Sequence, residues 1–107
     1  MTINLRKSDA KEPFSFVFVN AEGKTIVKSE NYAQKSSAKN GIESVKKNCQ
    51  DDARYEMKES SNGKFYFNIK STNGQVVGTS ALFDDEAQRD AAIAELKAKS
   101  SVAQIIE

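Results

Sequence analysis

Basic residues at helical spacing are the first candidates for binding chemistry in this chain. Lys39 and Lys46 follow Lys35 by four and eleven residues, separations that return to nearly the same angle on an α-helix. Asn40 adds an amide in the same segment. The flank could contact a phosphate or an acidic protein, but Glu43 lies among the lysines. Pairing at helical spacing therefore favours a solvated helix face over a binding site.

A second group of candidates alternates along one segment later in the chain. Tyr66, Asn68 and Lys70 are two residues apart, a period that places them on one face of a strand. A tyrosine can stack on a base while nearby lysines contact phosphates, which raises the hypothesis of single-stranded nucleic-acid binding. The net charge of +1 gives that hypothesis no global support.

The acidic run Asp84-Asp85-Glu86 could suggest metal or acid–base chemistry, yet it directly precedes an alanine-rich helical segment. Asp85 with Gln88 three residues later fits a capping box, and carboxylates at a helix start are favoured by the helix dipole. Adjacent carboxylates on one short segment would also need metal ligands from elsewhere. We expect a helix start here, with no metal and no cofactor.

The residues that are missing exclude more functions than the residues present suggest. The chain has no histidine, which removes histidine-based acid–base catalysis, histidine-activated nucleophiles and the commonest zinc ligand. The single cysteine, Cys49, cannot form an internal disulfide and ends an apolar helical stripe, so we expect a small buried side chain in a cytoplasmic protein. An enzyme would have to rely on carboxylates, lysines or tyrosines.

Charge is divided unevenly along the 107 residues. Residues 1–50 carry +4 and residues 51–107 carry −3. The split could orient an acidic partner toward the first half, although it also arises by drift after duplication. No apolar run reaches the roughly 18 residues needed to cross a bilayer, and the first residues lack the pattern of a signal peptide, so we expect no membrane association.

The candidates above lie on a unit of about fifty residues that occurs twice. Apolar and turn positions recur at a constant offset of 51 residues, namely Phe14 with Phe65, Phe16 with Phe67, Gly23 with Gly74, Ser29 with Ser80, Tyr32 with Phe83, Ile42 with Ile93 and Val45 with Leu96. Repeated patterns predict repeated folds that pack together. Each unit is marginal in size for a separate domain, so we expect one domain with a shared core, divided into repeats at 1–52 and 53–107.

The residue patterns of the two repeats predict the same order of strands and helix. Alternating apolar residues indicate strands at Ile3–Leu5, Phe14–Val19 and Lys24–Lys28, and in the second repeat at Phe65–Lys70 and Val76–Leu82. From Lys35 the pattern changes to an apolar stripe of Ala38, Ile42, Val45 and Cys49, which indicates a helix, and Ser36 or Ser37 offers an oxygen to cap its first turn. The segment Ala53–Lys58 can act as the last strand of one repeat and the first of the next, and Val102–Ile106 forms a final strand.

With both repeats laid out, the chain resembles the YegP-like family, small bacterial and archaeal proteins of unknown function. The resemblance covers nearly the whole chain and rests on Phe14–Val17 through Gly23, Lys28–Tyr32, Ser37–Asn48 and Gly63–Lys70. It implies three strands, a helix and a strand per repeat, with the final strands exchanged. The second repeat departs from the pattern, because Ala91 and Ala92 replace Asn40 and Gly41. The family supplies no catalytic residues to transfer.

We therefore predict an α+β pseudo-dimer within one monomeric chain. Its single antiparallel sheet would carry both helices on the Phe14/Phe16 and Phe65/Phe67 side. The other face would present Val17, Val19, Tyr66, Asn68 and Lys70. The leading function is a non-enzymatic binding or interaction module, with an acidic protein or a nucleic acid as partner. Weak single-stranded nucleic-acid binding through the open face and the basic helix flank is the first alternative. A carboxylate- or lysine-dependent enzyme is the second.

Overall fold

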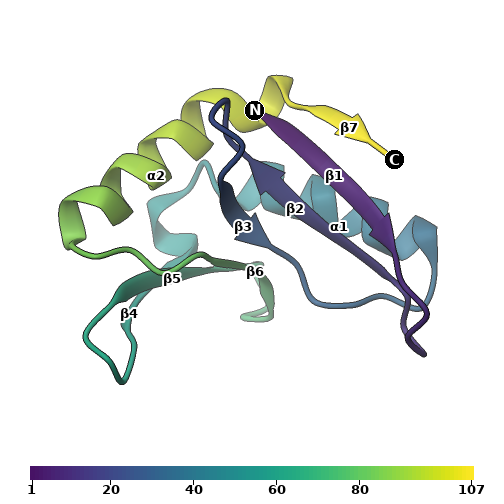
Figure 1. Ribbon diagram of the computed structural model, residues 1–107, viewed down its shortest axis with the longest axis horizontal. Helices are drawn as coiled ribbons and strands as arrows, with labels where there is room; N and C mark the ends of the chain where they lie inside the picture. The colour runs from purple at the N-terminus through teal and green to yellow at the C-terminus, as the bar shows by residue number, and fades with distance from the viewer.

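The computed structural model describes residues 1–107, which form two similar halves around one sheet (Figure 1). The first half contains β1 (Thr2–Lys7), β2 (Phe14–Val19), β3 (Thr25–Lys28), α1 (Lys35–Asn48) and the 3₁₀ helix η1 (Asp52–Arg54). The second contains β4 (Tyr55–Glu59), β5 (Phe65–Lys70), β6 (Val76–Ser80), α2 (Glu86–Lys99), the 3₁₀ helix η2 (Ser100–Val102) and β7 (Gln104–Ile106). The predicted α+β fold of two repeats is confirmed.

The strands form where apolar and polar residues alternate, and tight turns join them. The β2–β3 and β5–β6 turns contain Gly23 and Gly74, whose φ angles are 83° and 84°. Residues other than glycine adopt such angles at a cost, so these two equivalent glycines allow both hairpins to close.

The seven strands lie in the order β4-β5-β6-β3-β2-β1-β7. All neighbours are antiparallel except β1 and β7, which are parallel, so the prediction of an entirely antiparallel sheet is wrong at this edge. The reason is the route of the chain, since α2 carries it across the sheet and returns it beside the start of β1 (Figure 1).

The exchange of final strands occurs at one edge of the sheet. β7 of the second repeat pairs with β1 of the first, as predicted. The segment Ala53–Lys58 does not take both of its predicted roles, because β4 pairs only with β5 and lies at the opposite edge. The chain leaves α1 through η1 and enters β4 directly, which leaves no residues for a separate final strand of the first repeat.

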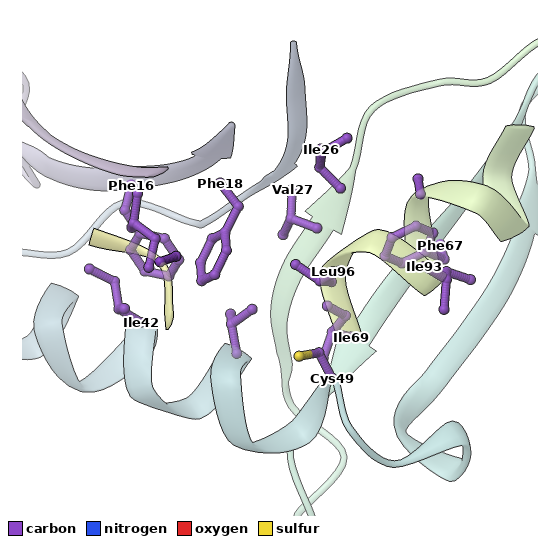
Figure 2. Packing of buried hydrophobic residues seen from close by; sticks show 14 of the residues in the cluster. Phe16, Phe18, Ile26, Val27, Ile42, Cys49, Phe67, Ile69, Ile93 and Leu96 are labelled. Atoms are coloured by element: carbon purple, nitrogen blue, oxygen red, sulfur yellow. The ribbon is translucent and has the colours of Figure 1, made fainter. Parts of the chain in front are cut away.

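Both helices cover the face of the sheet that carries Phe16 and Phe67, as predicted. α1 packs against β2, β5 and β6, and α2 packs against β5. Figure 2 shows Phe16 and Phe18 pointing from β2 toward Ile42 of α1. Sixteen buried residues from both repeats form one apolar cluster, which confirms the shared core. Each large apolar side chain in it contributes about 1.5–3 kcal/mol by leaving water.

The starts of the two helices differ. In α2, Asp85 accepts a hydrogen bond from the backbone N–H of Gln88 at 2.8 Å, which confirms the predicted cap. α1 begins at Lys35 after Gln34, whose side chain makes no capping bond, so the prediction that Ser36 or Ser37 caps this helix is wrong. Pairing of Tyr32 with Phe14 keeps the chain extended just before the helix, and the first turn forms before either serine. Neither helix is long and apolar enough to cross a membrane.

Candidate functional site on the open sheet face

The sheet face away from the helices carries a row of side chains that crosses six strands. Neighbours in this row are direct cross-strand partners, so their side chains lie side by side. From β1 to β4 the row is Asn4, Val17, Lys28, Thr79, Asn68 and Glu56. Lys28 of the first repeat and Thr79 of the second meet at the seam between β3 and β6.

A depression of about 710 Å³ lies over this seam. Arg6, Lys28 and Tyr66 line it together with the apolar side chains of Val17 and Leu82. Leu82 is 55% exposed, so its side chain forms part of the surface of the depression. The depression therefore combines an aromatic ring, an apolar wall and two cations.

Arg6 and Lys28 differ from most other cations of the chain because neither forms an ion pair. The lysines that do pair are Lys35, Lys39, Lys46, Lys58, Lys64, Lys70 and Lys97. An unpaired cation beside a concave surface remains available to an anionic ligand without first breaking an internal contact.

Asn68 and Lys70 lie on the open face near Tyr66, but Glu56 engages both. Asn68 Nδ2 donates to Glu56 Oε1 and Lys70 Nζ donates to Glu56 Oε2, each at 2.9 Å. Thr79 Oγ1 donates to Asn68 Oδ1 at 2.9 Å, which extends the network to β6. The hydrogen bond from Asn68, followed by that from Lys70, lowers the pKa of Glu56 below its usual value. The carboxylate stays ionised and neutralises Lys70.

The open face differs from prediction at Val19, which is only 9% exposed. The pairing of β2 with β3 shifts between Phe18 and Val19, a bulge that bends the strand, and paired threonines flank Val19 on both sides. Val17 lines the depression as an open-face residue.

The predicted helix flank lies on the other side of the molecule, on α1. Lys35 and Lys39 both pair with Glu107, the latter at 3.5 Å, and Lys46 lies 3.9 Å from Glu43. Asn40 is exposed on the same helix. The seven predicted site residues therefore form two separate groups, one on each side of the sheet.

Arg6 and Lys28 are not among the site residues predicted from the sequence. Each follows a buried apolar residue, Leu5 or Val27, so strand alternation could have placed both on the open face. Nothing in the sequence pairs β3 with β6, however, and that pairing brings Lys28 into the same depression as Tyr66.

A second depression, of about 780 Å³, lies between the β2–β3 hairpin and α2. Its lining includes Glu22, Lys24, Gln88 and Glu95, so charges of both signs surround it. Thr25, Ala81 and Leu82 line both depressions. No group of three or more His, Cys, Asp or Glu side chains is placed to hold a metal ion. In the acidic run, Asp84 pairs with Lys64 and Glu86 lies 3.8 Å from Arg89.

The duplicated unit, with helices on one face of a continuous sheet, defines a tandem-repeat α+β domain. The chain matches the family described as Domain of unknown function (DUF1508) twice, at residues 9–56 and 60–107. The chain therefore belongs to this family, in which the resemblance to YegP-like proteins also places it.

Relatives agree with this assignment. A UPF0339 protein from the ptx operon 5' region of Stutzerimonas stutzeri is 46% identical over 94% of this chain and 90% of its own length. YegP of Escherichia coli K12 is 44% identical over 82% of this chain and 80% of its own length.

Solved structures of relatives share the fold. The solution NMR structure of a UPF0339 protein from Shewanella oneidensis has a TM-score of 0.89 and 38% identity, covering 97% of this chain and 87% of its own. That of YegP from E. coli has a TM-score of 0.88 and 40% identity, covering 97% and 89%. The YegP structure is described as a protein of unknown function, and none of these names indicates an activity.

Proposed function

We propose that this protein is a non-catalytic binding module whose ligand lies on the open sheet face. The observation that carries the proposal is the depression over the β3–β6 seam, where Arg6 and Lys28 are unpaired beside Tyr66. This combination suits a ligand that has both anionic groups and a flat ring. The helix flank is a weaker candidate, because Glu107 already neutralises Lys35 and Lys39.

Single-stranded nucleic acid is the ligand that this chemistry favours. Its bases can stack on an exposed aromatic ring, and its phosphates can contact cations along the same groove. Tyr66 is half-buried and offers part of its ring, while Arg6 and Lys28 are exposed on the other repeat. A nucleic-acid strand that crosses the β3–β6 seam would contact both repeats.

A carboxylate- or lysine-dependent enzyme fits this surface less well. Glu56 is the carboxylate of the central row, and its pKa is lowered by hydrogen bonds from Asn68 and Lys70. A hydrogen-bonded carboxylate with a lowered pKa suits a structural role better than proton transfer near neutral pH. We place the module in the bacterial cytoplasm, in line with bacterial relatives and one free, buried cysteine.

The test is binding of fluorescently labelled single-stranded DNA and RNA by the full chain at about 50 and about 200 mM salt. Tyr66→Ala should weaken binding by about 1–3 kcal/mol through lost stacking. Arg6→Ala combined with Lys28→Ala should lower the magnitude of the salt slope by about 2.

The matched control is Lys47→Ala, because Lys47 is an exposed, unpaired lysine on the helix side of the molecule. It should leave binding nearly unchanged. Salt-sensitive binding that Lys47→Ala and Tyr66→Ala reduce equally would reject the open face as the site. Absence of binding to any oligonucleotide at the lower salt concentration would reject nucleic acid as the ligand.

A further inference from the structure

β1 and β4 are equivalent strands of the two repeats, but only β1 has a further strand on its outer side. At the first edge β7 lies parallel to β1, with Thr2 opposite Gln104 and Asn4 opposite Ile106. At the other edge β4 pairs with β5 alone. Leu5 in β1 lies opposite Phe16, and Met57 in β4 lies opposite Phe67, so β4 is the counterpart of β1. The outer edge of β4 is thus the counterpart of the site that β7 occupies.

Exposure differs between β1, which has β7 beside it, and β4, which has no strand on its outer side. Leu5 is 7% exposed in β1, whereas Met57 at the equivalent position is 50% exposed. The first repeat cannot supply the cover, because the residues equivalent to β7 lie in η1 and at the start of β4 itself. An open strand edge next to an exposed apolar side chain is a template for pairing with another chain.

The charged residues near the outer edge of β4 differ from those near β7, so the two edges favour segments of different charge. After β7, Glu107 pairs with Lys35 and Lys39 at the start of α1. The residues 51 positions after these lysines are Glu86 and Asp90, in the first turns of α2. Their side chains are 67% and 61% exposed. The electrostatic preference of this edge is therefore opposite in sign to that of the edge that β7 covers.

Nearby cations reduce this acidity without removing it. Arg89 lies 3.8 Å from Glu86 and 3.1 Å from Asp90, with its guanidinium near the ring of Phe65. Lys64 pairs with Asp84. The four carboxylates between residues 84 and 90 outnumber these two cations, so the start of α2 remains acidic.

We propose that the outer edge of β4 binds an extended segment of another protein as a parallel strand. Its apolar residues would cover Met57, and a lysine or arginine that follows them would contact Glu86 and Asp90. Main-chain hydrogen bonds supply affinity in such strand addition, and alternate side chains supply specificity. A second copy of this chain fits less well, because its own Glu107 would meet the two acids.

The test uses the ¹⁵N-labelled full chain and two amidated peptides spanning residues 101–107. One has the sequence of this chain, and the other carries Glu107→Lys. The Glu107→Lys peptide should shift the backbone amide signals of Tyr55–Glu59 and bind about two- to fivefold more tightly than the unmodified peptide, the effect of one exposed ion pair.

Three variants of the protein make the result decisive. Glu86→Lys combined with Asp90→Lys should reverse the preference between the peptides, and Met57→Lys should weaken binding of both. Val102→Lys changes an exposed apolar residue just before β7, at the other edge, and should alter neither affinity. Unchanged amide signals of β2, which lies in the other repeat and pairs with β1 and β3, would show that the variants remain folded.

Two outcomes would overturn the proposal. The first is the absence of shifts in β4 with either peptide, or a preference that the charge reversal leaves intact. The second is tighter binding of the unmodified peptide, which would assign the edge to a second copy of this chain instead of a basic partner segment.

Discussion

Val27 in β3 and Gly78 in β6 hold equivalent positions of the two repeats, 51 residues apart, and meet where the repeats join. A Cβ atom on Gly78 would lie 2.7 Å from Cγ1 of Val27. Two valines cannot fit there, so one repeat provides the side chain and the other provides the space. Duplicated halves must therefore diverge where their equivalent residues compete for the same volume.

The ends of the helices show a second meeting of equivalent residues. Cys49 Sγ lies 3.2 Å from Ser100 Oγ, and both residues are fully buried. Burial raises the pKa of the Cys49 thiol, while the contacts with Ser100 and Gln50 partly oppose that shift. Cys49 is thus a small buried side chain, as predicted, and it contacts its own counterpart.

The two helices also differ inside α1, at Gly41, for a related reason. A Cβ on Gly41 would overlap the hydroxyl oxygen of Tyr32 and would lie 3.0 Å from Cε2 of Phe16. The second repeat has Ala92 and Phe83 at the positions of Gly41 and Tyr32. The first repeat therefore combines the Tyr32 hydroxyl with a glycine at residue 41. The second repeat has no hydroxyl at Phe83 and can hold the methyl group of Ala92.

The largest effect is expected from exchanging side chains at the seam. Val27→Gly should cost about 2–5 kcal/mol of unfolding free energy, because it leaves a cavity in the core. Gly78→Val alone should cost about 1–3 kcal/mol through overpacking. The double variant should lose markedly less unfolding free energy than the sum of these two costs. Urea unfolding measures the loss in each variant. Strictly additive costs would contradict competition for one volume.

The next effect concerns Gly41 and Tyr32. Gly41→Ala should destabilise the protein by about 1–2 kcal/mol, because the steric cost exceeds the gain in helix propensity. Adding Tyr32→Phe, which reproduces the second repeat, should recover part of the loss. A thermodynamic double-mutant cycle measures this coupling. Stabilisation by Gly41→Ala alone would show that Tyr32 moves aside at no cost.

A smaller effect is expected at the helix caps. Asp85→Ala should cost about 1 kcal/mol, because Asp85 accepts the N–H of Gln88. Its counterpart Gln34 makes no such bond, so Gln34→Asp should add up to about 1 kcal/mol. Thermal unfolding of both variants provides the comparison. Negligible changes in the melting temperature of both variants would mean that packing alone determines where each helix begins.

The smallest effect is a pH dependence at the edge that β7 covers. The hydrogen bond from Lys35 lowers the pKa of Glu107 below its usual value of 4.5. A carboxylate with a depressed pKa in the folded state stabilises that state above the unfolded pKa, and this contribution is lost as the pH falls through the folded value.

The amide signals of Ile105 and Ile106 should therefore change as the pH falls below about 4.5. Glu107→Gln should remove this transition while leaving signals from the β4 edge unaffected. A transition that persists in Glu107→Gln would assign it to another carboxylate.

Sequence alone determined the repeat, the α+β class, the shared core and the buried state of Cys49. These follow from local patterns, because strand alternation and helical spacing decide which residues must leave water together. The cap at Asp85 was also predictable, since capping involves residues three apart.

Tertiary structure alone decided the parallel direction of β7, the open edge of β4 and the meeting of Arg6 and Lys28 with Tyr66. Each depends on which strands become neighbours, and contacts between residues far apart in the chain determine strand order. A period of two assigns a side chain to a face, but it carries no information about the strand that will lie beside it.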